Sequence, residues 1–389
     1  MSDAQVKIPA TYMRGGTSKG VFFRGDVLPD QPAERDRLLL RILGSPDPYG
    51  KQIDGMGGAT SSTSKVVIVS KSARPGCDVD YLFGAVAIDA PIVDWSGNCG
   101  NLLAAVGPFA LAQGLVAAPR DGHAVVRIWQ VNTRRLIVAH VPIREGQVVE
   151  VGNFQLDGVA FPGAEIRLEF IDPGGGDEAG AGAMLPTGNV QDLLEVPGVG
   201  PVRATLINAG NPMVLVAAGD LKLRGEESQR EVNADRELLH RCEAVRAFGA
   251  VRMGLAASAA EATANRPATP KLALVSGPAG YVASGGKAIS AADLDLNVRV
   301  LSMGQLHHAL PGTAAVAIAV AAKIPGTIVH RVLADRVGAE VVRLGHPSGC
   351  FAVSAEAELR EGLWSVTKVV MSRSARRLME GLVLAPPDR

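Results

Sequence analysis

The order of hydrophobic and polar residues predicts short strands interrupted by two long apolar helices. The stretches 65–70, 124–129 and 136–140 are rich in β-branched residues and are bounded by turn formers, which is typical of β-strands. The segments 102–115 and 314–323 are long, apolar and rich in alanine, and they predict buried helices. Each is a helix around which a curved sheet could wrap.

Two polar stretches shape the expected organisation. The segment 173–182 is dominated by glycine and carries two acids, so it predicts a flexible loop and the boundary between two domains. The domains would span residues 1–180 and 181–389, with the C-terminal tail joining the first. The charged stretch 224–241 predicts one solvated surface helix.

Length and composition exclude several classes of protein. A chain of 389 residues with 47% hydrophobic residues suits two cores and is not disordered. The formal net charge is zero, which argues against nucleic-acid binding. The longest apolar stretch, 314–322, is too short to span a membrane, and residues 1–9 do not form a signal peptide, so a cytoplasmic location is expected.

The cysteines and histidines predict neither disulfides nor a metal site. The four cysteines are widely scattered in a chain without a secretion signal, so free thiols are expected. The adjacent His307 and His308 would diverge on a strand or a helix, which does not gather metal ligands.

The two halves of the chain follow the same plan. A small-residue turn runs into an apolar strand at 13–23 and again at 207–216. Later in each half a short tripeptide, at 99–101 and at 311–313, opens an alanine-rich helix. This repetition predicts a structural duplication, with a site in the cleft between two similar domains.

Two loops offer hydrogen-bond donors for an anion. Residues 14–19 (RGGTSK) combine glycines, hydroxyls and two cations, a set that suits a carboxylate or phosphate; a plain turn is the alternative. Residues 54–65 (DGMGGATSSTSK) place hydroxyl groups before an apolar strand. Lys65 stands at the start of that strand, where partial burial would make it a usable base; a surface lysine is the alternative.

A cysteine and a histidine stand in comparable settings. Cys99 precedes the predicted helix 102–115, where the positive end of the helix dipole stabilises a thiolate, although most buried cysteines only pack. His346 and Ser348 lie in the turn 345–350 and either line a site or serve a structural role.

Several of these segments closely resemble the PrpF family of 2-methylaconitate cis–trans isomerases. The resemblance runs over nearly the whole chain. The segments that carry it are 13–23, 54–65, 94–101, 208–212, 307–309, 345–349 and 371–376.

The resemblance implies a diaminopimelate epimerase-like fold of the α/β (α+β) class, with two pseudo-symmetric domains that each wrap a curved sheet around a central helix. The epimerases carry a catalytic cysteine at both helix starts, whereas this chain has Cys99 at one and Pro311 at the other. The two-cysteine mechanism is therefore not expected. What the PrpF family implies instead is an acid–base pair of Lys65 and Cys99, with Lys65 preferred as the base and the reverse order left open.

The implied reaction moves an allylic proton on a small tricarboxylic acid in the 2-methylcitrate route of propionate breakdown. It needs a base, an acid and donors for the carboxylates, but no cofactor and no metal. A homodimer is compatible with the sequence. The predicted substrate-binding residues are Arg14, Gly16, Thr17, Ser18, Lys19, Gly57, Gly58, Ser61, Ser62, Gly100, Asn101, Asn211, Gly312, Thr313, His346 and Ser348.

Other activities remain open at this stage. Relatives catalyse 4-oxalomesaconate tautomerisation and methylitaconate isomerisation, which the same acid–base pair would serve. Ser62 and Lys65 also satisfy the Ser-x-x-Lys pattern of acyl hydrolases, but that pattern needs a helical turn and this segment is poor helix material. A protein that only binds carboxylates is a third alternative.

Overall fold

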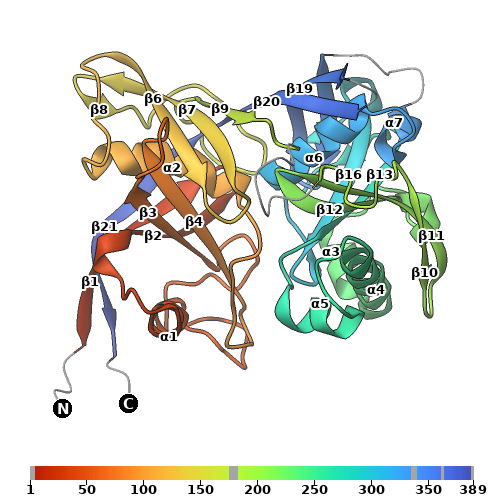
Figure 1. Ribbon diagram of the computed structural model, residues 1–389, viewed down its shortest axis with the longest axis horizontal. Helices are drawn as coiled ribbons and strands as arrows, with labels where there is room; N and C mark the ends of the chain where they lie inside the picture. Colours follow the sequence, from red (N-terminus) through yellow and green to blue (C-terminus); the bar gives the residue numbers. More distant parts are fainter. Residues whose placement is uncertain (1–4, 175–182, 334–339, 361–362, 387–389) are drawn as a thin grey trace. The chain divides into compact units, whose positions relative to one another are not determined.

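The computed structural model describes residues 5–174, 183–333, 340–360 and 363–386 (Figure 1). Its contacts divide the chain into two compact units. Unit 1 comprises residues 1–132, 136–168 and 372–389, and unit 2 comprises residues 133–135 and 169–371. The C-terminal segment therefore returns to unit 1. The predicted boundary at 180/181 lies outside the described residues.

Unit 1 is built on a hairpin that is extended by further strands on both sides. Its strands are β1 (Val6–Gly15), β2 (Ser18–Arg24), β3 (Lys65–Lys71), β4 (Val79–Val86), β5 (Val93–Asp94), β6 (Gly122–Gln130), β7 (Arg135–Arg144), β8 (Gln147–Val148) and β21 (Ala375–Ala385), and its helices are α1 (Pro32–Leu43) and α2 (Gly100–Ala112). β1 pairs antiparallel with β2 and with β21, β2 runs parallel to β3, β3 antiparallel to β4, and β4 parallel to β6. The predicted strands 65–70, 124–129 and 136–140 are thus confirmed as β3, β6 and β7.

Unit 2 repeats this plan with its own elements. They are β10 (Asp192–Val196), β11 (Gly200–Ala209), β12 (Asn211–Ala217), α3 (Gln229–Ala234), α4 (Arg236–Arg252), α5 (Ala259–Asn265), β13 (Lys271–Ser276), β14 (Tyr281–Val282), β15 (Ala288–Ile289), β16 (Leu296–Ser302), β17 (Gln305–Leu306), α6 (Gly312–Lys323), α7 (Ile328–Leu333), β18 (Val341–His346) and β19 (Gly349–Arg360). β9 (Ile166–Ile171) and β20 (Leu363–Arg373) have residues in both units, as does β7, whose first residue, Arg135, belongs to unit 2.

The pairing of the strands establishes the duplication. β11 and β12 form an antiparallel hairpin, β12 runs parallel to β13, β13 antiparallel to β16, and β16 parallel to β18. The same sequence of orientations joins β1, β2, β3, β4 and β6 in unit 1. In each unit the central helix, α2 or α6, follows a short strand, β5 or β17, that pairs antiparallel with its predecessor in this series.

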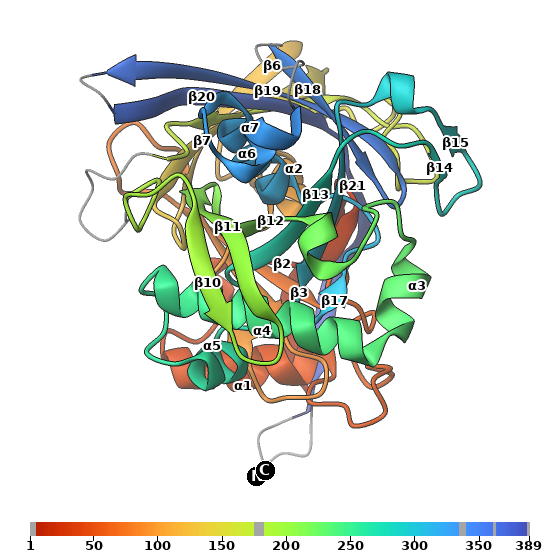
Figure 2. The same ribbon diagram turned by 90° about the vertical axis from the view of Figure 1, so that its right-hand side faces the viewer.

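Each unit encloses one of the two predicted alanine-rich helices. Residues 100–111 of α2 and 312–322 of α6 are all buried, since small apolar side chains cover every face of both helices. α2 contacts β1, β2 and β21, and α6 contacts β11, β12 and β19. Figure 2 shows α6 under β19. The prediction of one buried helix in each half is confirmed, although α2 begins at Gly100 and ends at Ala112.

A second helix covers the opposite face of the hairpin sheet in each unit. In unit 1, Leu39, Ile42 and Leu43 of α1 pack in one core cluster with residues of β1, β2, β3 and β21. In unit 2, Leu238 and Cys242 of α4 pack with residues of β10 to β13. The hairpin sheets are therefore buried on both faces.

The expected single helix over 224–241 is wrong. Two helices, α3 and α4, occupy this region, and Asp235 lies between them. Ser228 caps α3 in a capping box with Glu231, and the Asp235 side chain accepts a hydrogen bond from Leu238 N. Leu238 is buried, so the start of α4 belongs to the core.

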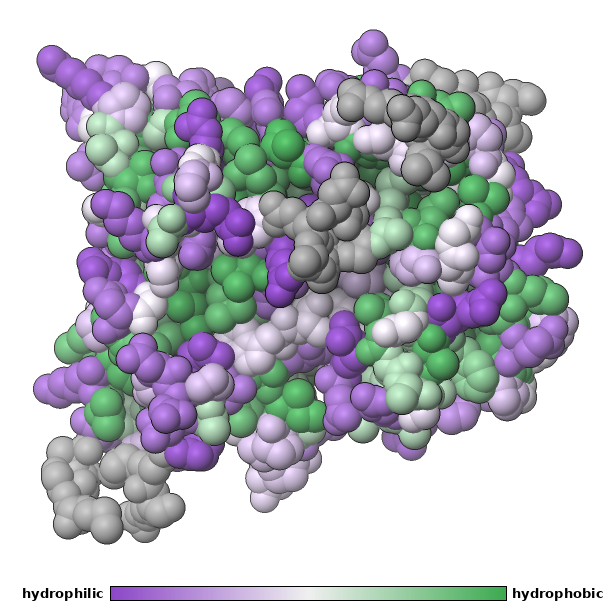
Figure 3. All heavy atoms as spheres, viewed as in Figure 1, coloured by the Kyte–Doolittle hydropathy of each residue, from purple (hydrophilic) through white to green (hydrophobic). Residues whose placement is uncertain are grey.

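The surface is mixed in polarity. On the face shown in Figure 3, hydrophilic and hydrophobic residues are interspersed. Within the described part of the chain, none of the helices is long and apolar enough to cross a membrane.

The hairpin turn of each unit lies against the N-terminal part of its central helix. A Cβ on Gly15, at the end of β1, would be 2.5 Å from Asn101 O and 2.8 Å from Leu102 Cα. Gly210, between β11 and β12, has a φ of +71°, and its Cβ would be 3.0 Å from Val316 Cγ1. These close approaches need glycine, and in unit 1 they bring the turn beside the helix start.

Candidate active site

Cys99 is the N-cap residue of α2. Its backbone is extended, with a φ of −117° and a ψ of 95°, and its carbonyl accepts the first helical hydrogen bond, from Leu103 N at 2.9 Å. The side chain turns back onto the helix, where Leu102 N donates to Sγ at 3.4 Å. The thiol therefore lies at the positive end of the α2 dipole, as the sequence predicts.

Lys65 reaches this thiol from the first position of β3. Its Nζ lies 3.3 Å from Cys99 Sγ and donates to Ser18 Oγ at 3.0 Å. Ser18 Oγ and Cys99 Sγ are 4.0 Å apart. All three residues are buried, with exposed fractions of 7% for Lys65, 6% for Cys99 and 3% for Ser18. Because β2 begins at Ser18 and runs parallel to β3, both strand starts are at the same end of the sheet.

The electrostatics of this group favour a thiolate. Burial raises the pKa of Cys99, but the positive charge of Lys65 and the hydrogen bonds from Leu102 N and Lys65 outweigh it, so the pKa lies below its ordinary value of 9.0. Tyr81 behaves oppositely, because burial and then the charge of Cys99 raise its pKa well above 10.0. Its neutral hydroxyl donates to Cys99 O at 3.2 Å.

The hairpin turn 14–19 lies beside the pair. Arg14 NH1 donates to Gly16 O at 3.0 Å and to Ser374 O at 2.9 Å. Burial, followed by the charge of Arg376, lowers the pKa of Arg14. Thr17 Oγ1 accepts from Asn101 at 2.9 Å. These contacts hold the turn against Ser374 and the start of α2.

Lys19 and the hydroxyl-rich loop meet through the backbone. Lys19 N donates to Ser62 O at 3.1 Å, and Lys19 Nζ lies 5.4 Å from the centre of the Tyr12 ring. Ser62 is buried, Ser61 and Gly57 are half-buried, and Gly58 is exposed. The structure therefore places the 57–62 loop next to the start of β2.

The Ser-x-x-Lys alternative does not fit this geometry. Lys65 begins a strand, not a helical turn, and its Nζ contacts Ser18 and Cys99. Ser62 Oγ lies 2.9 Å from Thr60 Oγ1. The lysine is thus directed at the thiol rather than at Ser62.

The remaining predicted residues belong to unit 2. Asn211 is buried at the start of β12, and Gly312 and Thr313 are buried in the first turn of α6. His346 ends β18, and its Nδ1 accepts from Ser348 N at 3.2 Å. All of these residues lie in unit 2, whereas Gly100 and Asn101 lie with Cys99 at the start of α2 in unit 1.

Sequence reasoning missed two residues at the pair. Tyr81 lies in an ordinary strand pattern that carries no signal of its contact with Cys99. Arg373 is 2% exposed and donates from Nε to Asn101 Oδ1 at 3.1 Å. Its segment, 371–376, was part of the family resemblance, but nothing in its spacing indicated a role.

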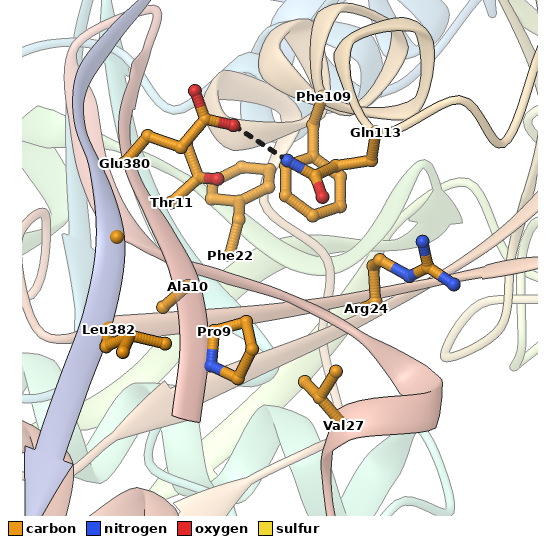
Figure 4. Close-up of a pocket in the computed structure, with 11 residues that line it drawn as sticks. Pro9, Ala10, Thr11, Phe22, Arg24, Val27, Phe109, Gln113, Glu380 and Leu382 are labelled. Carbon is orange, nitrogen blue, oxygen red and sulfur yellow. Dashed lines mark hydrogen bonds between the residues drawn. The ribbon is translucent and has the colours of Figure 1, made fainter. Parts of the chain in front are cut away.

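A pocket lies at the C-terminal end of α2. It has a volume of about 230 Å³ and is lined by Phe22, Phe109 and Gln113, among others (Figure 4). Gln113 Nε2 donates across it to Glu380 Oε1 at 2.9 Å. Because Phe109 and Gln113 lie at the C-terminal end of the helix, this pocket is distinct from the Cys99 group. In the described residues no group of three or more His, Cys, Asp or Glu side chains could hold a metal ion.

Comparison with known proteins agrees with this fold. The chain is 59% identical to a 2-methyl-aconitate isomerase of Cupriavidus necator, over 99% of this chain and 98% of that protein. A crystal structure of a methylitaconate-delta-isomerase matches with a TM-score of 0.75 and 40% identity, over 99% of this chain and 97% of that one. A hydroxyproline epimerase from Agrobacterium vitis, 12% identical with a TM-score of 0.54, shares the fold over 98% of this chain and 93% of that one. The predicted diaminopimelate epimerase-like fold is confirmed.

The match to a family is equally extensive. The family described as PrpF protein covers residues 5–386. This range contains parts of both units and every residue of the Lys65 and Cys99 group. The alignment with the Cupriavidus necator relative also covers nearly the whole chain. The chain belongs to the PrpF family.

Proposed function

We propose that the protein is a cofactor-independent isomerase that interconverts the geometric isomers of 2-methylaconitate. The observation that carries the proposal is the buried contact of 3.3 Å between Lys65 Nζ and Cys99 Sγ. An allylic proton transfer needs a base and an acid that reach the same substrate, and this contact puts two such groups side by side. The 59% identity to a 2-methyl-aconitate isomerase supports this choice of substrate.

The reaction is derived from the substrate's own chemistry. Its CH₂ group lies next to a carboxylate and to the double bond, so loss of a proton gives an extended dienolate. In that anion the former double bond has partial single-bond character and can rotate. Return of the proton to the same carbon yields the other geometric isomer.

The electrostatics favour Cys99 as the base. The lowered pKa of Cys99 favours its sulfur as the group that takes the proton, and Lys65 as the group that returns one. The proton left on sulfur then passes to the lysine nitrogen across the 3.3 Å contact, which restores the pair. This is the reverse of the order preferred from the sequence, which left both open. Ser18 Oγ accepts a hydrogen bond from Lys65 and keeps the ammonium beside the sulfur.

Charge on the dienolate calls for donors near the pair. The hairpin turn 14–19 and the loop 57–62 adjoin it and carry hydroxyl groups, N–H groups and two cations. Fixed donors of this kind stabilise charge that develops on a carboxylate oxygen. We propose that they hold the carboxylates of a small tricarboxylic acid.

Methylitaconate is the second candidate substrate, because a methylitaconate-delta-isomerase shares 40% identity and the fold. The same pair would return the proton to the other end of the dienolate and shift the double bond. 4-Oxalomesaconate would use the same chemistry. The position at which the proton returns separates these activities.

The deciding experiment is an NMR assay of the purified protein in D₂O with 2-methylaconitate, trans-aconitate, methylitaconate and oxalomesaconate. Interconversion of the methylaconitate isomers with deuterium uptake at the CH₂ group is expected. Binding without exchange would contradict the proposal and favour a protein that only binds carboxylates. Faster turnover of methylitaconate or oxalomesaconate would change the proposed substrate but would leave the proposed acid–base pair unchanged.

We also propose a cytoplasmic location, because all four cysteines are free thiols, as is typical of a reducing compartment. A homodimer stays a prediction, which analytical ultracentrifugation would test.

A further inference from the structure

Arg373 brings a buried cation to the Cys99 group from the far end of the chain. It closes β20, and the unit 1 part of the C-terminal segment begins one residue earlier. Its guanidinium is almost fully buried, with Nε donating to Asn101 Oδ1 at 3.1 Å and NH1 donating to Ser372 O at 3.1 Å. A buried arginine needs a local reason, since its desolvation is costly.

Asn101 also forms a hydrogen bond with the hairpin turn. Its Nδ2 donates to Thr17 Oγ1 at 2.9 Å. Because a guanidinium has donors only, the amide oxygen must face Arg373, which leaves the amide nitrogen for Thr17. Asn101 lies in the first turn of α2, two positions after Cys99, so one side chain joins Arg373, the helix start and the turn.

The backbone of the same segment holds the turn a second time. Ser374 O accepts hydrogen bonds from Gly16 N at 2.8 Å and from Arg14 NH1 at 2.9 Å. Gly16 has a φ of +51°, and a Cβ there would overlap Asn101 Oδ1. The turn that leads into Ser18 is thus packed between Asn101 and the segment at Arg373.

We propose that Arg373 is a positioning residue for the acid–base pair. Through Asn101 it fixes the first turn of α2, which carries Cys99, and the turn that carries Ser18. This inference rests on the proposed function, because the pair it positions is the one assigned to proton transfer.

The charge of Arg373 also bears on the ionisation of Cys99. Burial lowers the pKa of Arg373, and the charge of Cys99 opposes that effect. Attraction between two charges is mutual, so the guanidinium also favours the Cys99 thiolate. Lys65 and Arg373 thus place two basic side chains at the Cys99 group, an arrangement that suits an anionic substrate.

The test compares Arg373→Met with Arg373→Lys, and uses Arg144→Met, an exposed arginine of β7 in the same unit, as the matched control. The first readout is the pH dependence of Cys99 alkylation by iodoacetamide, followed by peptide-resolved mass spectrometry. The second is kcat and KM for 2-methylaconitate. Arg373→Met should shift Cys99 alkylation to higher pH and lower kcat by roughly 10²-fold, with a smaller change in KM.

Arg373→Lys should restore most of the alkylation profile, because it keeps the charge, but only part of kcat, because it loses the planar contact with Asn101. A wild-type alkylation profile and kcat in Arg373→Met would overturn the inference. If that variant does not fold, Asn101→Ala and Arg373→Lys are measured alone and together, and additive losses in kcat would overturn it as well. Alkylation needs no substrate, so inactivity of the wild-type enzyme would refute the proposed function separately.

Discussion

Lys65 Nζ lies 3.3 Å from Cys99 Sγ, although 34 positions separate the two residues in the chain. The contact joins a strand start to a helix start, and both positions are set by the backbone of one unit. A lysine alone at a strand start or a cysteine alone at a helix start has many structural explanations. Their buried contact with each other is what favours an acid–base function.

Cys99→Ser should lower kcat by about 10²–10⁴-fold while aconitate still binds. A serine hydroxyl ionises far less readily than a thiol, yet it has nearly the same size and can still cap α2. Steady-state kinetics and aconitate titration measure the two effects. Cys77→Ser, which alters a half-buried cysteine outside the site, should leave both unchanged. If Cys99→Ser turns over substrate as fast as the wild type, Cys99 only caps α2 and does not transfer a proton.

Arg14→Ala should weaken aconitate binding roughly ten- to hundredfold, in line with the loss of about 1.5–3 kcal/mol for a charge-assisted hydrogen bond. The variant loses a cation beside the pair and also releases Gly16 O and Ser374 O. Isothermal titration calorimetry gives the affinity. Arg24→Ala removes an arginine from the other end of β2, whose partner is Asp26, and should bind as the wild type does. If both variants bind aconitate with the same affinity, Arg14 does not contribute to substrate binding.

The sequence predicts the elements that carry the site because their signals are local. An alanine-rich apolar run indicates a buried helix wherever it occurs, and α2 and α6 followed that rule. The prediction of one surface helix over 224–241 was wrong because it used the average polarity of the segment. That average does not reveal the break at Asp235 or the burial of Leu238. Two N-caps, Ser228 and Asp235, were the signals that separate the two helices.

Arg373 could not be found in this way. Its contact with Asn101 spans 272 positions, and no local pattern encodes a contact of that separation. Lys65 and Cys99 were identified because each also has a local setting, and because the family resemblance pairs them. A buried arginine in an otherwise ordinary strand end has no such signal.

Gly15→Ala should destabilise the fold by about 1–3 kcal/mol and lower turnover. The added Cβ would lie 2.8 Å from Leu102 Cα, so the hairpin turn or the start of α2 must move. Thermal and denaturant unfolding measure the loss. Gly381→Ala is the matched control, since this strand glycine has nothing within 4 Å of its Cβ position. Equal stability of the two variants would contradict the close approach.

The ionisation of Cys99 sets the expected pH dependence. Its folded-state pKa lies below the ordinary 9.0, so its thiolate stabilises the fold fully above that value, and the contribution is lost as the pH falls through the folded pKa. Turnover should fall over the same acid-side range. Lys65→Met removes the charge that lowers the pKa, and burial then raises it, so alkylation of Cys99 should begin at higher pH than in the wild type. Lys71→Met, at the exposed end of β3, is the control, and Cys242, whose pKa burial raises to about 12, should stay unreactive in both. If Cys99 is alkylated with the same pH profile in Lys65→Met as in the wild type, the thiolate–ammonium pair is wrong and Lys65 returns as the base.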